Sequence, residues 1–181
     1  MISEEQLQQW ASAPAASKFK YTHEEVRKAL ANYLSEFAKS NHGYELKNEN
    51  YEVYLQGSYA NSTNITGESD VDIVIELNSI FSYDIDQLTD EEKQTFHSFY
   101  SNPSQYKFAQ FKKDVFASLE KYFSKTTLEY GAKSLKIPKN SSRVNADVIP
   151  AFHHRKYGRF TYYTIDQYVS GIKLYNTETN E

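Results

Sequence analysis

The chain has 181 residues, of which 39% are hydrophobic and 24% charged, a composition typical of one globular domain over 1–181. The net charge of −4 argues against a general nucleic-acid binder, which usually carries a basic surface. The absence of cysteine excludes disulfides, thiol catalysis and zinc–thiolate sites. No apolar run approaches the ~20 residues of a membrane span, and the start Met-Ile-Ser-Glu-Glu-Gln lacks the apolar region of a signal peptide. We therefore expect no membrane association and a cytoplasmic location.

Two capping-box patterns predict helices in the first 45 residues. Ser-Glu-Glu-Gln at 3–6 opens a short helix that reaches Trp10. Thr-His-Glu-Glu at 22–25 opens a second, amphipathic helix to about residue 40, and Gly43 is suited to end it in a left-handed turn. The second helix is expected to pack over a sheet.

The next stretch predicts two strands joined through a Gly-Ser turn. The first strand is short and apolar, at 53–55, and the second begins with two aspartates, Asp70 and Asp72. Successive side chains of a strand point to opposite faces, so both aspartates share one face and four apolar residues share the other (Val71, Ile73, Ile75 and Leu77). Like charges ~4 Å apart repel by about 4 kcal/mol at an effective dielectric near 20. Water or a cation between the two carboxylates would relieve this repulsion, and Mg²⁺ commonly binds one or two carboxylates together with substrate phosphates.

The turn itself suits a phosphate. Gly57 permits a sharp exit from the strand and close approach of a ligand to the backbone, and the Ser58 hydroxyl adds a donor. A helix that began at this turn would direct free N–H groups at an anion. A phosphate site beside a metal site is typical of phosphoryl or nucleotidyl transfer.

The remaining residues predict two more helices and a set of short strands. A polar excursion at 78–103 holds one short helix, at 90–100, and a long helix follows at 104–123. Lys112 and Lys113 lie off the apolar stripe of that helix, so both are expected to be solvated. Strands are predicted at 127–130, 134–137, 144–149 and 171–175, with Pro150 ending the third of these or lying on an edge. The fold class is therefore α/β, a twisted mixed sheet backed by two long helices.

Asp147 is anomalous because it interrupts an apolar strand, and a buried carboxylate is rare unless it is paired or metal-bound. A solvent-facing aspartate is the alternative for this residue alone. Beside Asp70 and Asp72, it completes a predicted three-carboxylate site. Three bases could reach a phosphate or lie exposed, and the sequence does not rank them (Lys136, Lys139 and Arg143). The neighbouring His153 and His154 point to opposite faces of a strand, which argues against one shared ion.

Gly57-Ser58, eleven residues and then Asp70-Val-Asp72 together resemble the Gly-Ser…Asp-x-Asp motif of the DNA polymerase β nucleotidyltransferase superfamily. The fuller wording, Gly-Ser-Tyr-Ala-Asn-Ser-Thr-Asn-Ile at 57–65 and Ser-Asp-Val-Asp-Ile-Val at 69–74, is similar to the bacterial cyclic-oligonucleotide synthases. These are relatives of the animal cytosolic DNA sensor and of oligoadenylate synthetase. The resemblance implies a polymerase β-like core and places the family's third carboxylate at Asp147.

The resemblance also implies a reaction: NTPs are joined into a cyclic or linear oligonucleotide messenger of anti-phage defence, with two Mg²⁺ or Mn²⁺ ions. Asp70 and Asp72 would hold the ion on the triphosphate and share the second, which Asp147 completes while it assists deprotonation of the attacking ribose hydroxyl. Gly57 and Ser58 would bind the β- and γ-phosphates. Gln56 precedes the turn as in the family, where a structural role is the alternative to nucleotide binding.

The resemblance covers nearly all 181 residues but only about the first half of a family protein, whose helical C-terminal half would pack over the base. We expect a fragment or a shortened relative that binds NTP–Mg²⁺ weakly and makes little oligonucleotide. Two other functions stay open. One is nucleotidylation of a protein, an antibiotic or a tRNA end, and the other is a non-catalytic nucleotide-binding module.

Overall fold

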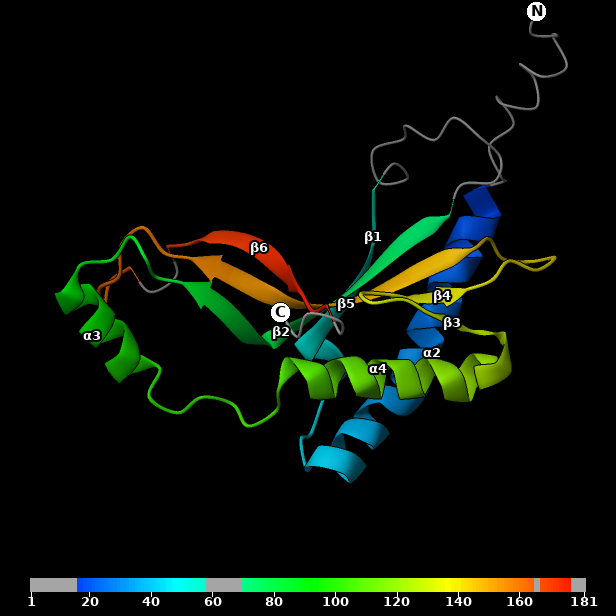
Figure 1. Cartoon of the computed structure of the whole chain (residues 1–181), viewed down its shortest axis with the longest axis horizontal. Coiled ribbons are helices and arrows are strands. Elements are labelled where there is room, and N and C mark those ends of the chain that lie inside the picture. Colours follow the sequence, from blue (N-terminus) through cyan, green and yellow to red (C-terminus); the bar gives the residue numbers. More distant parts are fainter. Residues whose placement is uncertain (1–15, 58–69, 165–166, 177–181) are drawn as a thin grey trace, which may run out of the picture.

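The computed structural model describes residues 16–57, 70–164 and 167–176 (Figure 1). The predicted helix that ends at Trp10 and the predicted phosphate-binding Ser58 lie outside these residues. Within them, no helix is both long and apolar enough to cross a membrane.

Six strands form one mixed sheet in the order β1-β2-β5-β4-β3, with β6 also paired to β5. The parallel pair β2 and β5 forms its centre, and the other pairs are antiparallel. The strands are β1 (Tyr51–Gln56), β2 (Val71–Asp84), β3 (Glu129–Tyr130), β4 (Leu135–Ile137), β5 (Ala146–Lys156) and β6 (Val169–Leu174). The α/β fold class and the mixed sheet predicted from the sequence are confirmed.

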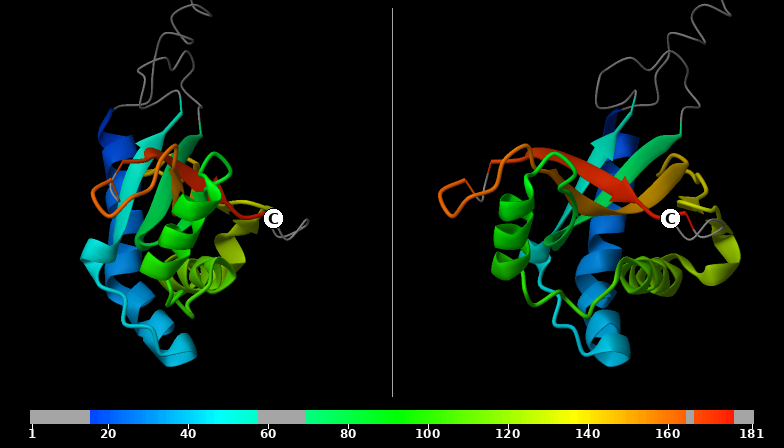
Figure 2. Two further views of the ribbon diagram at one scale, coloured as in Figure 1. Left: turned by 90° about the vertical axis from the view of Figure 1, so that its left-hand side faces the viewer. Right: turned by 60° about the vertical axis from the view of Figure 1, so that its left-hand side comes forward.

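Two long helices, α2 (Ala16–His42) and α4 (Phe108–Phe123), lie against the same face of the sheet (Figures 1 and 2). The main core lies between them and the sheet. It holds the apolar side chains that the alternation of β2 predicted to share a face (Val71, Ile73, Ile75 and Leu77), together with Leu30 and Leu34 of α2 and Phe111 and Val115 of α4. The opposite face of β2 therefore carries Asp72, Val74 and Glu76.

The start of α2 differs from the prediction. Thr22 lies inside the helix rather than at its N-cap, and its side chain is 1% exposed. Its hydroxyl donates to the Lys18 carbonyl at 2.7 Å and accepts from the backbone N–H of Val144 at 3.2 Å. A tertiary hydrogen bond thus uses the hydroxyl that the capping-box pattern assigned to the helix start. The end of α2 is as predicted, because Gly43 adopts φ +65° and its N–H donates to the Lys39 carbonyl.

Both central strands are longer than predicted. β2 continues past Asn78 to Asp84, and its register against β5 shifts between Leu77 and Phe81, which breaks the alternation that marked the strand in the sequence. β5 continues through Pro150 to Lys156. On the edge away from β2, β5 pairs with β4 over Ala146–Val148 and with β6 over 151–156. Pro150 falls between these two partners, where its missing N–H costs no ladder bond.

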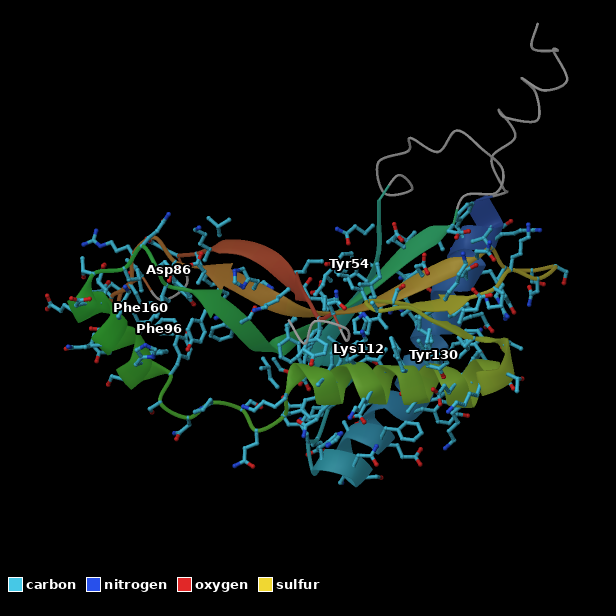
Figure 3. All side chains as sticks on the ribbon, in the orientation of Figure 1. Tyr54, Asp86, Phe96, Lys112, Tyr130 and Phe160 are labelled. Atoms are coloured by element: carbon cyan, nitrogen blue, oxygen red, sulfur yellow. The ribbon has the colours of Figure 1, made fainter. Side chains whose placement is uncertain are left out.

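A smaller helix, α3 (Asp90–Phe99), covers the far end of β2 and β5 (Figure 1). Thr89 caps it, since its hydroxyl accepts from the Glu92 N–H at 3.3 Å. A second cluster of buried rings lies between α3 and the sheet and includes Phe96 of α3 and Phe160. Their ring centroids are 5.0 Å apart, and both residues are labelled in Figure 3. These aromatic side chains therefore serve the packing of α3 against the sheet.

Lys112 of α4 is buried, contrary to the prediction that both lysines at 112 and 113 are solvated; its exposed fraction is 3%. Its ammonium donates to the carbonyls of Ala132 and Tyr175 at 2.7 and 3.3 Å, and burial lowers the pKa of its amine. These carbonyls lie in the β3–β4 turn and just after β6, far away in sequence. Lys112 therefore ties three separate segments together (Figure 3).

Candidate active site

A row of four polar side chains crosses the sheet on the face opposite α2 and α4. Gln56 of β1 is the register partner of Asp72 in β2, Asp72 is the partner of Asp147 in β5, and Asp147 is the partner of Lys136 in β4. Register partners on neighbouring strands lie ~5 Å apart and point to the same face. The sheet thus places the second and third predicted carboxylates side by side, with an amide at one end of the row and an ammonium at the other.

Asp72 carries the electrostatic cost of this arrangement. Partial burial raises the pKa of its carboxyl, and the negative charges of Asp147 and Asp70 raise it further. Each of these causes disfavours the charged form. A cation bound between Asp72 and Asp147 would offset the loss of solvation at Asp72 and the repulsion between the two carboxylates.

Asp70 lies just before β2, and each of its oxygens has a side-chain partner, one in β4 and one just before β5. Lys136 Nζ donates to Oδ2 at 2.7 Å, and Asn145 Nδ2 donates to Oδ1 at 2.9 Å. The hydrogen bond from Lys136 is the main cause that lowers the pKa of Asp70, and the same bond raises the pKa of Lys136. The first predicted carboxylate is therefore turned toward a lysine and an asparagine.

This orientation decides what the row can bind as it stands. Among the residues described, no group of three or more His, Cys, Asp or Glu is arranged to hold a metal ion. The donor set itself fits a hard divalent cation, because it consists of carboxylate oxygens and because a positive group, the Lys136 ammonium, already lies on Asp70. In this arrangement Asp70 is directed at Lys136 and Asn145 rather than gathered with Asp72 and Asp147 around one point. The predicted roles of Asp70, Asp72 and Asp147 stay predictions.

Gly57 follows Gln56 directly and has φ +82°, a conformation that residues with a side chain rarely adopt. A Cβ at this position would lie 2.8 Å from Asp72 Oδ2. The glycine thus makes room for the Asp72 carboxylate, a reason that the sequence did not indicate. Its predicted contact with phosphate stays a prediction, as does the predicted nucleotide binding by Gln56.

The same face of the sheet continues into a groove of about 560 Å³. Its lining includes six polar or aromatic side chains (Tyr54, Gln56, Glu76, His153, Arg155 and Tyr168); we call it the open-face groove. Tyr54 is labelled in Figure 3, on the side of the sheet away from α4. Gln56 belongs both to the row of polar side chains and to the groove, so the two are continuous.

Glu76 is the centre of the groove's hydrogen bonding. Its Oε1 lies 2.6 Å from His153 Nδ1, and its Oε2 accepts from the Tyr54 hydroxyl at 2.9 Å. Burial and this hydrogen bond raise the pKa of Tyr54. His154 instead lies 2.8 Å from Ser82 Oγ, so the two neighbouring histidines have separate partners. Arg155 lies between the rings of Phe81 and Tyr168, 3.9 and 4.5 Å from their centroids.

Sequence reasoning left part of this site unranked or unassigned. It could not rank the three bases, whereas the structure places Lys136 on Asp70 and Arg143 over the ring of Phe123, 5.1 Å from its centroid. It gave no role to Glu76 or His153, which are 77 residues apart. For Glu76 the available signal was its position on the aspartate face of β2. For Asn145, whose amide donates to Asp70, it was the pattern Asn-Ala-Asp at 145–147.

Comparison with known proteins places the chain among nucleotidyltransferases. Residues 32–134 match the family described as "Nucleotidyltransferase domain", a span that includes Asp70 and Asp72 and ends before Asp147. The cyclic nucleotide synthase CdnE01 of Staphylococcus haemolyticus is 34% identical over 181 residues, covering 99% of this chain and 57% of that protein. The cyclic UMP-AMP synthase of Rhodothermus marinus is 36% identical over 174 residues, covering 96% of this chain and 54% of that protein.

Solved structures agree with this similarity. The Rhodothermus marinus CdnE c-UMP-AMP synthase, solved with Apcpp and Upnpp, matches with a TM-score of 0.73 and 33% identity, over 100% of this chain and 55% of that one. The Elizabethkingia meningoseptica CdnE cyclic dinucleotide synthase, solved with GTP and Apcpp, matches with a TM-score of 0.59 and 28% identity, over 100% and 54%. The resemblance stated from the Gly-Ser…Asp-x-Asp wording is confirmed.

The chain spans about half the length of the relatives it matches. The matched portion contains the whole described sheet, both long helices and the row from Gln56 to Lys136. On its fold, its motif and the family match over more than half of its residues, the chain belongs to the nucleotidyltransferase domain family.

Proposed function

We propose that this chain is the catalytic core of a metal-dependent nucleotidyltransferase that joins NTPs into a cyclic or linear oligonucleotide messenger, in anti-phage signalling. One observation carries the proposal: Gln56, Asp72, Asp147 and Lys136 are in register across four strands, next to Gly57. Relatives that are 34–36% identical are a cyclic nucleotide synthase and a cyclic UMP-AMP synthase, which supports this choice of product class.

Two divalent ions, Mg²⁺ or Mn²⁺, would neutralise the triphosphate and acidify the attacking hydroxyl. Asp70, Asp72 and Asp147 would hold them. Asp147 takes the proton of the ribose hydroxyl as that oxygen forms a bond to the α-phosphorus. The bond from the α-phosphorus to the bridging oxygen breaks, and pyrophosphate leaves toward Gly57 and Ser58.

The open-face groove is suited to the nucleoside of a substrate. Its lining combines the side chain of Ile172 and the rings of Tyr54 and Tyr168 with the hydrogen-bonding groups of Glu76 and His153. A nucleobase combines apolar faces with a polar edge, which matches such a lining. Asp72 and Glu76 are four positions apart along β2, about 13 Å, so a nucleotide can reach from one to the other.

The test is incubation of the chain with labelled NTPs and Mg²⁺ or Mn²⁺, with chromatographic separation of products and calorimetric titration of ATP. We expect Mg²⁺-dependent ATP binding, and any product to contain linked nucleotides. Both should be lost on Asp70→Asn combined with Asp72→Asn. The matched control is Asp84→Asn, a carboxylate at the far end of β2 that pairs with Lys156 at 3.1 Å. Turnover that survives the double substitution, or label that is transferred to a protein acceptor, would contradict the proposal.

A further inference from the structure

Lys136 has two neighbours among the predicted catalytic carboxylates and contacts one of them. Its register partner is Asp147, yet its ammonium lies 2.7 Å from Asp70 Oδ2. The side chains of Lys136 and Asp70 are each 34% exposed. An exposed Lys–carboxylate pair of this kind is weak and changes an equilibrium by a factor of about five at most. Such a contact can be exchanged for another at little cost.

The charges at this end of the row favour such an exchange. Three carboxylates and one ammonium leave two net negative charges, and burial already disfavours the charged form of Asp72. A divalent cation brings twice the charge of the ammonium and needs the same Asp70 oxygens. An ammonium released from Asp70 remains beside Asp147, where an incoming triphosphate would supply anionic oxygens.

We propose that Lys136 is a positioning residue that holds Asp70 away from the site until a divalent ion with a triphosphate arrives, and then pairs with a phosphate oxygen. The inference rests on the metal site of the proposed function. Asn145 acts with Lys136, because its amide holds the second Asp70 oxygen at 2.9 Å and fixes the carboxylate in the turned orientation. The lysine thus competes with the bare ion and assists the ion–triphosphate complex.

Because of this double role, Lys136→Met should change the affinities for Mn²⁺ and for tripolyphosphate in opposite directions. The loss of a purely structural lysine would not have this effect. Without the ammonium, Mn²⁺ alone should bind about 2–5-fold more tightly, because Asp70 no longer has to leave a partner. At saturating Mn²⁺, inorganic tripolyphosphate should bind several-fold more weakly, since one phosphate contact is lost. Lys136→Arg keeps the charge and should restore both affinities toward those of the parent chain.

The experiment measures free Mn²⁺ by electron paramagnetic resonance, and tripolyphosphate binding by calorimetry, on the full chain. Lys156→Met is the matched control, because Lys156 forms the same kind of pair with Asp84 at the other end of the sheet. It should change neither affinity. Thermal unfolding of each variant checks the fold, and Lys136→Gln replaces Lys136→Met should the latter not fold.

The outcomes separate this inference from the proposed function. If Asp72→Asn binds Mn²⁺ as well as the parent chain does, the metal site itself is wrong. If Asp72→Asn loses the ion but Lys136→Met leaves Mn²⁺ affinity unchanged or weaker, the proposed function stands and the exchange by Lys136 is refuted. Tighter Mn²⁺ binding with unchanged tripolyphosphate affinity would refute the second half, the transfer of the ammonium to phosphate.

Discussion

Replacement of Asp72 by asparagine should stabilise the metal-free fold. Asp72 and Asp147 are register partners, so their carboxylates are about 5 Å apart, and their repulsion is about 1–3 kcal/mol for effective dielectrics between 80 and 20. Asparagine keeps the shape and removes the charge. For a domain of this size, 1 kcal/mol corresponds to about 2–4 °C in Tm, so we expect a rise of several degrees at neutral pH.

The pH dependence tests the cause of this effect. The pKa of Asp72 is raised in the folded state above its ordinary value of 3.8, so the unfolded chain loses the proton first as the pH rises. The charged form therefore destabilises the fold increasingly above pH 3.8, and the advantage of Asp72→Asn should grow from acid to neutral pH. Adding Mg²⁺ should reverse the order of Tm values, because only the parent chain gains stability from the ion.

Thermal unfolding by circular dichroism between pH 3 and 8, with and without Mg²⁺, measures both effects. Asp84→Asn is the control, since the backbone N–H of Asp86 and the ammonium of Lys156 lower the pKa of Asp84. That variant should gain no stability at neutral pH. An Asp72→Asn chain that is less stable than the parent at neutral pH without metal, or whose advantage does not depend on pH, would refute the repulsion argument.

Three further predictions concern the glycine turn, the core and the groove. Gly57→Ala should lower the free energy of unfolding in urea by about 1–3 kcal/mol. It should also weaken ATP–Mg²⁺ binding, because its Cβ would displace the Asp72 carboxylate. Gly43→Ala, with φ +65° and no atom within 4 Å, should lose stability alone, and equal ATP affinities in the two variants would count against the reasoning. Asp114→Ala should lower the free energy of unfolding by about 2–4 kcal/mol, since the carboxylate is 1% exposed and accepts from the Tyr106 hydroxyl at 2.6 Å. A loss below about 1 kcal/mol would show that this buried hydrogen bond is dispensable. His153→Ala should weaken ATP binding about tenfold at saturating Mg²⁺ and leave tripolyphosphate binding unchanged, and equal losses for both ligands would exclude a nucleoside contact in the groove.

Periodicity predicted the parts of the fold that depend on short-range pattern. The alternation in β2 gave both the core face and the face that carries Asp72, because a strand inverts its side chains at every residue. The helical spacing of apolar residues gave the covering helices α2 and α4. The short distance in sequence between the Gly-Ser turn and the two aspartates made the motif readable without a structure.

Features that depend on contacts between distant segments could not be predicted. Pro150 continues a strand because β4 and β6 end on either side of it. Lys112 is buried because two carbonyls, 20 and 63 residues away, receive its ammonium. The orientation of Asp70 is of the same kind, since Lys136 is 66 residues away, and local pattern carries no information about such a pair.

Anomalous scattering of Mn²⁺ in crystals of this chain grown with Mn²⁺ and ATP tests directly whether the row of polar side chains holds the metal. We expect a manganese peak that contacts Asp72 and Asp147, with Asp70 turned from Lys136 toward the ion and the triphosphate beside Gly57. A manganese–ATP complex bound away from this row, with Asp70 still held by Lys136 and Asn145, would contradict it.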